Sequence, residues 1–220
     1  MALSRSVEDY LKAIYAQSER GEPAGTTELA RVLDVQPASV TGMVKKLAEE
    51  GLLEHEPYRG VTLTAAGNRE ALKILRRHRV LEAFLVERLG FTWDDVHEEA
   101  ELLEHTASDR LIDRMADALG NPATDPHGSP IPTSAGEIDP TIYVPLNEVA
   151  AGSQITVRSV SDEDPSRLRY FKSVGLLPGA TAVVEAVATS DGAVTLTIGA
   201  GSEPLSIGSA AAGRIRVSEG

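Results

Sequence analysis

The stretch His97-Glu-Glu-Ala-Glu-Leu-Leu-Glu-His105 is dense in side chains that can bind a metal ion or a proton. At about 100° per residue, an α-helix would bring four of them within a third of its circumference: His97, Glu101, Glu104 and His105. Because an apolar stripe of Ala and Leu runs beside them, this polar group is expected to face partly inward. Buried charge is costly unless it is paired or coordinated. The stretch indicates either a metal site or a solvated helix face with internal hydrogen bonds.

Other possible ligands lie outside this stretch. His78 and Glu82 are four residues apart in a helical pattern and therefore share a helix face. Further candidates lie in loops or beside the apolar stripe of the first expected helix: Asp9, Asp125, His127 and Asp164. The chain contains no cysteine, so any metal site must use oxygen and nitrogen ligands. Such ligands suit Mn(II), Fe(II), Co(II) or Zn(II), and hard carboxylates favour Mn(II).

The elements that would position these residues begin with a DNA-binding pattern. Three helical patterns cover residues 7–20, 28–33 and 37–50, with a turn before the third, and two short extended pieces follow at residues 52–55 and 61–64. This is the order of a winged helix-turn-helix. Two longer helices are expected at residues 64–89 and 94–119. Six prolines within residues 121–147 indicate a linker or an irregular ordered segment.

The C-terminal part changes to short strands separated by glycines, which is typical of a small β-barrel. The expected strands are residues 155–157, 181–187, 194–198 and 214–217. The fold class is therefore mainly α with a small β domain. No run of 18 apolar residues occurs, so no membrane span is expected. The absence of an apolar signal segment and of cysteine fits a cytoplasmic protein.

Charge is distributed unevenly along the chain. The whole chain has a net charge of −12, but residues 1–92 are neutral and all the excess acid lies in residues 93–220. The first part can therefore approach phosphate if its basic residues cluster. The third helical segment exposes small and hydroxyl side chains suited to base edges, followed by lysines suited to phosphates. The DNA-contact candidates are Thr27, Pro37, Ala38, Ser39, Thr41, Gly42, Lys45, Lys46 and, at the wing tip, Arg59.

Three other functions make different demands on the sequence. A di-metal enzyme in a helical bundle needs paired Glu-x-x-His motifs, and the residue three before His105 is Leu102. A zinc hydrolase motif also fails, because Glu101 stands where its second histidine belongs. A winged-helix repressor that senses a small molecule remains an alternative, with the acidic residues merely solvated.

The assembly as a whole resembles the diphtheria toxin repressor family of metal-dependent transcriptional regulators. The resemblance covers nearly the whole chain and rests on five stretches: residues 7–15, 37–47, 77–82, 96–105 and 125–132. It implies a winged helix-turn-helix domain (residues 1–72), a helical metal-binding and dimerisation domain (73–140) and an SH3-like, FeoA-type β-barrel (148–220). It also implies a homodimer that binds a double-stranded DNA operator. No association with a membrane is implied.

The resemblance further implies two metal sites. The primary site would use Asp9, Glu101, Glu104 and His105, with His78 nearby. The second would draw on His78, Glu82, His97, Asp125, His127 and a barrel acid, Asp164. Carboxylates at Asp9 and Glu101 match the manganese-sensing branch, whereas the iron-sensing branch has Met and Cys there. The expected function is a Mn(II)-activated repressor of metal-transport genes, with Fe(II) as the alternative ion and Co(II), Ni(II), Zn(II) or Cd(II) as surrogates.

Lys12 departs from the small manganese sensors of this family, which have Glu at its position. A charged lysine cannot ligate a metal and repels cations. The departure argues against a closely spaced pair of ions, and Lys12 is expected to pair with Asp9 when no metal is bound.

Overall fold

The computed structural model describes residues 3–19, 23–56, 60–161, 163–199 and 203–220. The chain divides into two compact units, each of which draws on several segments. Unit 1 comprises Met1–His78, Glu101–Arg114 and Ile131–Asp139, and unit 2 comprises Arg79–Ala100, Met115–Pro130 and Pro140–Gly220. Each unit has its own hydrophobic core.

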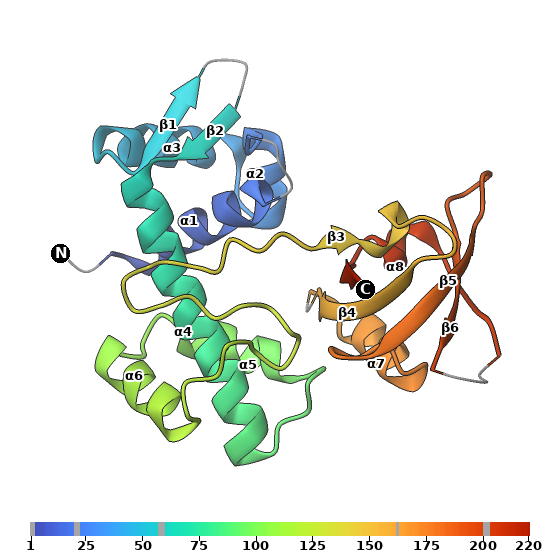
Figure 1. The fold of residues 1–220 in the computed structure, drawn as a ribbon. Helices are drawn as coiled ribbons and strands as arrows, with labels where there is room; N and C mark the ends of the chain where they lie inside the picture. Colours follow the sequence, from blue (N-terminus) through green and yellow to red (C-terminus); the bar gives the residue numbers. More distant parts are fainter. Residues whose placement is uncertain (1–2, 20–22, 57–59, 162, 200–202) are drawn as a thin grey trace. The chain divides into compact units, whose positions relative to one another are not determined.

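Unit 1 begins with the winged helix-turn-helix that the sequence predicts (Figure 1). It contains α1 (Arg5–Ser18), α2 (Thr26–Val32), α3 (Pro37–Glu49) and the antiparallel pair β1 (Leu53–Glu56) and β2 (Gly60–Leu63). Pro37 occupies the first turn of α3, where its missing N–H costs nothing. The buried stripes of α1 and α3 meet in one core, which includes Leu11, Ile14, Val40 and Leu47.

The long helix α4 (Ala65–Leu89) starts where expected, because the Thr64 hydroxyl accepts a hydrogen bond from the Gly67 N–H at 3.0 Å and caps the helix. The prediction of one helix over residues 94–119 is wrong. The structure has α5 (Val96–Leu103) and α6 (Asp109–Ala118) instead. Ser108 begins the new helix, since its hydroxyl accepts from the Leu111 N–H at 3.3 Å.

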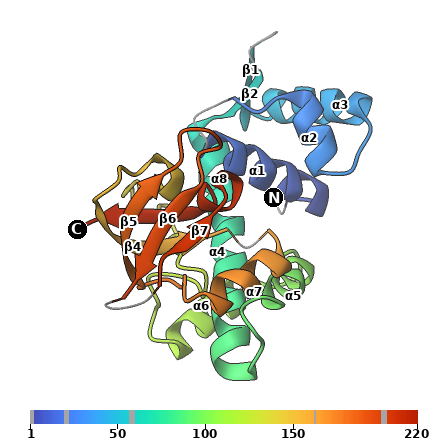
Figure 2. The same cartoon turned by 90° about the vertical axis from the view of Figure 1, so that its right-hand side faces the viewer.

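Among the described residues, the β domain of unit 2 is one antiparallel sheet of six strands in the order β3-β8-β4-β5-β6-β7. Figure 2 labels four of them, β4 to β7. Its strands are β3 (Val144–Pro145), β4 (Gln154–Val160), β5 (Thr181–Val187), β6 (Val194–Ile198), β7 (Leu205–Ile207) and β8 (Ile215–Glu219). The short helices η1 (Leu146–Glu148), α7 (Pro165–Ser173) and α8 (Ser209–Ala212) complete it. Phe171 of α7 is fully buried in the core with Leu168 and Leu196.

The prediction of a mainly helical chain with a small β domain is confirmed. All four predicted strands are present, and β3, β7 and the helices α7 and α8 are additional. In the part of the chain that the structure describes, no helix combines the length and apolarity needed to cross a membrane.

Candidate metal centre

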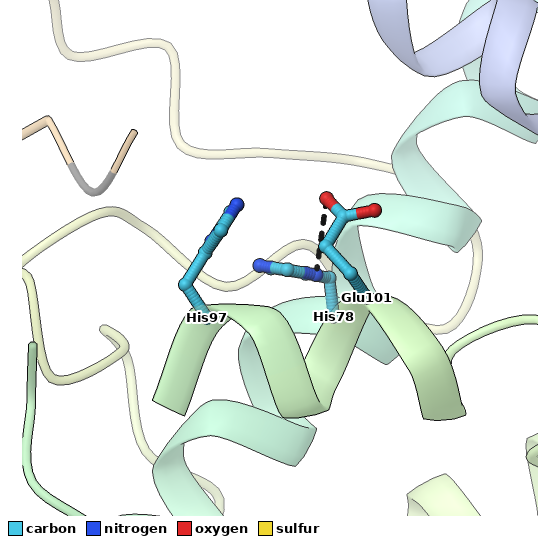
Figure 3. A group of neighbouring side chains, drawn as sticks. All are labelled: His78, His97 and Glu101. Atoms are coloured by element: carbon cyan, nitrogen blue, oxygen red, sulfur yellow. Dashed lines mark ion pairs between the residues drawn. The ribbon is translucent and has the colours of Figure 1, made fainter. Parts of the chain in front are cut away.

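Unit 1 brings together ionisable side chains from segments far apart in the sequence. They come from α1, from α4, from the last turn of α5 and from the turn that follows it: Asp9 and Lys12, His78, Glu101, and Glu104 and His105. His78 and Glu101 point toward one another, with Nδ1 3.9 Å from Oε1 (Figure 3). Glu101, Glu104 and His105 each offer a ligand atom within 4.8 Å of the others. The cluster therefore contains a set of metal-capable atoms close enough to share one ion.

Glu104 lies at the centre of this cluster and its side chain has no exposed surface. Its Oε2 lies 2.6 Å from His78 Nδ1, and its two oxygens accept hydrogen bonds from the Lys12 ammonium at 2.9 and 3.0 Å. Burial raises the pKa of Glu104, but the hydrogen bond with His78 and the charge of Lys12 outweigh burial and leave the pKa below its usual value. Glu104 is therefore held as a carboxylate, the form that binds a metal.

His105 presents its two ring nitrogens to different carboxylates. Nδ1 lies 2.7 Å from Glu8 Oε2, whereas Nε2 lies 3.0 Å from Asp9 Oδ1 and 3.4 Å from Glu104 Oε1. Despite these short distances, Nε2 is buried and makes no hydrogen bond of acceptable geometry with any described residue. A buried ring nitrogen beside two carboxylate oxygens is suited to share a cation with them. The donor set of unit 1 thus fits a divalent metal ion.

The carboxyl of Asp9 has a raised pKa within this cluster. Burial raises the pKa of its carboxyl above the usual 3.8, and the neighbouring charges of Glu101 and Glu104 add to this rise. Attraction to His105 and Arg5 offsets only part of it. Three carboxylates near one point repel each other, and a divalent cation would relieve that repulsion.

Glu8 belongs to this cluster although the sequence analysis did not select it. It is buried, and its second oxygen accepts a hydrogen bond from Arg77. Arg77 also reaches Asp109 at 3.4 Å. Glu8 precedes Leu11 by three residues, which places it along the buried face of α1, and a carboxylate there requires a partner. That position was the only signal in the sequence, since Arg77 lies 69 residues away.

Lys12 does not pair with Asp9, the partner expected from the sequence. Its ammonium lies 2.5 Å from Glu101 Oε1 and bonds both oxygens of Glu104, whereas Asp9 faces His105. Burial lowers the pKa of Lys12, but the charges of Glu104 and Glu101 outweigh it, so the pKa is raised. Lys12 is therefore a charged ammonium among the possible ligands.

Unit 2 contains a second cluster, formed by three buried side chains. Glu82 of α4, Asp125 and His127 offer ligand atoms within 4.8 Å of one another. Glu82 Oε2 lies 3.6 Å from His127 Nδ1, and Glu82 Oε1 lies 3.2 Å from His97 Nδ1 on α5. The Arg79 guanidinium lies 3.5 Å from Asp125 Oδ2. Four of the residues expected in the second site are thus neighbours in unit 2.

The segment that carries Asp125 and His127 is fixed to the β domain by its backbone. Gly128 has φ +86°, and a Cβ at this position would lie 2.0 Å from the carbonyl oxygen of Arg158 in β4. Only glycine tolerates this close approach. His127 itself lies 2.6 Å, through Nε2, from the Trp93 carbonyl oxygen, and the two rings stack at 5.7 Å. These contacts leave Nδ1 of His127 directed at Glu82.

Asp164 has a structural role that the sequence analysis did not assign. Its carboxylate caps α7 by accepting from the Ser166 and Arg167 N–H groups at 2.9 and 3.2 Å. Among the described residues, the ligand cluster of unit 2 does not include it. His78, which was expected to serve both sites, contacts Glu104 and Lys12 in unit 1.

The candidate DNA contacts lie mostly on the exposed surface of α3. The exposed positions of this helix that were selected from the sequence are Pro37, Ala38, Ser39, Thr41, Gly42, Lys45 and Lys46, and Thr27 is exposed on α2. A Cβ on Gly42 would meet nothing within 4 Å, so the surface there is open. Arg59, the candidate at the wing tip, lies outside the described residues.

Comparison with known proteins assigns each part of the chain to a family model. The iron dependent repressor N-terminal DNA binding domain matches residues 2–61, the iron dependent repressor metal binding and dimerisation domain matches 64–133, and the FeoA domain matches 144–219. The iron-dependent repressor IdeR of Mycobacterium tuberculosis is 32% identical over 206 residues, which cover 88% of each chain.

Solved structures give the same result across the full length. A manganese-dependent transcriptional repressor in complex with manganese has a TM-score of 0.87 at 39% identity and covers 97% of this chain and 99% of its own. The manganese regulator SloR has a TM-score of 0.82 at 33% identity, with both chains fully covered.

The fold and the comparisons together define a metal-dependent DNA-binding transcriptional regulator rather than an enzyme. The chain belongs to the iron-dependent repressor family, which includes IdeR and the diphtheria toxin repressor.

Proposed function

We propose that Mn(II) activates this regulator and that it represses metal-transport genes as a cytoplasmic homodimer bound to a double-stranded DNA operator. The ligand set of unit 1 is the observation that supports Mn(II), because it combines carboxylates with imidazole and contains no sulfur. Hard oxygen ligands with imidazole suit Mn(II). A similar solved repressor is described as manganese-dependent, whereas IdeR is described as iron-dependent, so Fe(II) is the competing ion. Co(II), Ni(II), Zn(II) and Cd(II) would act as surrogates.

Two groups of residues are assigned as ligands under this proposal. The first ion would bind Asp9, Glu101, Glu104 and His105, with His78 beside it. The second would bind Glu82, Asp125 and His127, with His97 beside it and Asp164 as the candidate from the β domain. The distances in each cluster support these assignments for all but Asp164, which caps α7.

Asp9 links the DNA-binding helices to the ligand turn. It lies on α1, within the proposed winged helix-turn-helix domain (residues 1–72), whereas Glu104 and His105 belong to the proposed helical domain (73–140) that precedes the barrel (148–220). The ion supplies the positive charge that these carboxylates can share. Asp9 and Glu104, bound to one ion, would hold α1 at a fixed distance from the turn after α5. In a homodimer this would set the spacing of the two α3 helices, which must enter major grooves about 34 Å apart.

The DNA contacts follow from the exposed surface of α3. Ser39 and Thr41 can hydrogen-bond base edges, and the Ala38 methyl can contact a thymine methyl. Lys45 and Lys46 would contact phosphates. Because metal would favour the DNA-competent state, DNA must in turn tighten metal binding. A change from 1:99 to 99:1 requires about 5.5 kcal/mol of differential affinity.

The proposal is tested by DNA binding under controlled metal. A duplex selected from a random pool by the protein with Mn(II) is labelled, and its binding is followed by fluorescence anisotropy at fixed salt. Mn(II) should raise the affinity strongly, anaerobic Fe(II) less so, and chelator should reverse the effect. A stronger response to Fe(II) would make Fe(II) the activating ion. An affinity for the duplex that no metal changes would refute metal activation.

Asp9→Ala provides the matched variant. It should abolish the Mn(II) response and leave the helical circular dichroism unchanged, because Asp9 links α1 to the ligand turn. Glu70→Ala, which removes a half-buried carboxylate on α4 that pairs with Lys73, serves as the control and should respond like the wild type. A full Mn(II) response in Asp9→Ala would contradict the assigned role of Asp9.

A further inference from the structure

The Lys12 ammonium lies among the groups that the proposed function assigns to the first metal ion. It lies 2.5 Å from Glu101 Oε1, 2.9 and 3.0 Å from the two oxygens of Glu104, and 3.3 Å from His78 Nδ1. These contacts come from α5, from the turn after it and from α4, so the ammonium is surrounded on several sides. Such an arrangement of carboxylate oxygens around one positive charge is what a bound cation has.

We propose that Lys12 acts as a resident cation of the metal-free site and that an incoming divalent ion must displace its ammonium from Glu101 and Glu104. Lys12 thereby sets the metal concentration at which the regulator responds. This inference rests on the proposed function, because it assumes that these two carboxylates bind the metal.

Burial explains why a resident cation is needed. The side chain of Glu104 has no exposed surface, and a buried carboxylate without a positive partner is strongly destabilising. Lys12 supplies that partner when no metal is present. Without it, Glu101 and Glu104 of the metal-free protein would lose the ammonium that both contact, and Glu104 would keep His78 as its remaining cited partner.

The chemistry of the ammonium makes the two cations competitors. An ammonium has three donors and no lone pair, so it can occupy carboxylate oxygens but cannot join the metal's ligand set. Lys12 already engages both oxygens of Glu104 and one of Glu101. A metal that takes these oxygens must therefore take them from Lys12.

The side chain of Lys12 also has a route out of the site. It retains 19% of its surface exposed, and its four-carbon stem is flexible, so the ammonium can move to water. Only molecules in which Lys12 has left the carboxylates can bind metal. The apparent metal affinity is therefore the intrinsic affinity multiplied by the fraction of such molecules.

The test compares Mn(II) binding without DNA in the wild type and in Lys12→Leu, which removes the charge and offers no ligand atom. Binding is measured by competition with a fluorescent chelator, and the melting temperature is recorded with and without Mn(II). Lys12→Leu should bind Mn(II) at least about tenfold more tightly. Its metal-free form should melt lower than the wild type, and Mn(II) should raise its melting temperature by more.

Three further variants make the result specific. Lys12→Arg keeps the charge and should bind Mn(II) close to the wild-type affinity, and Lys12→Gln replaces Lys12→Leu if the latter does not fold. Lys73→Leu removes a half-buried lysine that pairs with Glu70 on α4, and it should leave the Mn(II) affinity unchanged. The Glu82 cluster is intact in every variant, so differences between them arise in unit 1.

The outcomes separate this inference from the proposed function. If the wild type binds Mn(II) but Lys12→Leu binds it equally or more weakly, the resident-cation role is refuted and the metal site stands. Equal loss of stability with and without Mn(II) would likewise show that Lys12 is only structural. If the wild type neither binds Mn(II) nor is stabilised by it, both proposals fail.

Discussion

Glu8→Gln is the change that best tests how the first site is held together. Glu8 accepts from Arg77 and lies 2.7 Å from His105 Nδ1, so it favours the tautomer with the proton on Nδ1. That tautomer leaves the lone pair of Nε2 directed toward Asp9 and Glu104. A glutamine fills the same space but lacks the charge that stabilises both partners. Glu8 would thus act on the metal through His105 without touching it.

The magnitude follows from this arrangement. Loss of a hydrogen-bonded partner of a ligating histidine typically lowers metal affinity by about 10- to 100-fold, which corresponds to about 1.4–2.7 kcal/mol. The folded state should also lose about 1–3 kcal/mol, because Arg77 and His105 are both largely buried and lose a charged partner.

The measurement is Mn(II) affinity by chelator competition, together with the free energy of unfolding in urea with metal removed. Glu70→Gln, on α4 and paired with Lys73, is the control and should change neither quantity. A variant that loses stability but binds Mn(II) within about twofold of the wild type would refute the positioning role, since a positioned tautomer must affect affinity.

Three further outcomes are expected. Gly128→Ala should lower the free energy of unfolding by at least about 2 kcal/mol, because its Cβ would clash with the Arg158 carbonyl at positive φ; urea denaturation measures this. In the metal-free protein, Glu104 stabilises the fold above its ordinary pKa of 4.5, and this stability is lost as pH falls through its lowered folded-state pKa. Glu104→Gln should remove that part of the pH dependence in thermal melts. Lys45→Ala should weaken DNA binding for all sequences alike and reduce the salt slope by about 1, as anisotropy at several salt concentrations would report.

Hydrophobic periodicity was sufficient to place the helices of the winged helix-turn-helix because each buries one face. The pattern of α3, with Pro37 at its start and Val40, Val44 and Leu47 inward, is the pattern that the structure buries. The turn after Leu103 was missed, because it contains neither glycine nor proline and the periodicity continues past it. The capping residue Ser108 was the available signal.

The candidate sites could be predicted only in part for a different physical reason. Residue type and helical spacing select Glu82 and His97 as possible ligands, and the structure places them 3.2 Å apart. Spacing cannot show which distant partner a side chain meets. The pairing of Glu8 with Arg77 and that of Lys12 with Glu104 depend on packing between elements that are 69 and 92 residues apart.

The end of α5 explains how one short stretch can supply so many contacts. In an uninterrupted helix, Glu101 and His105 would lie one above the other with parallel directions. Because α5 ends at Leu103, the next two residues are free of that constraint. Glu104 can then be fully buried against His78 and Lys12, while His105 turns its two nitrogens to Glu8 and Asp9 on α1. The interruption is therefore what allows this stretch to reach α1, and contact with α1 is the step by which metal would act on the DNA-binding helices.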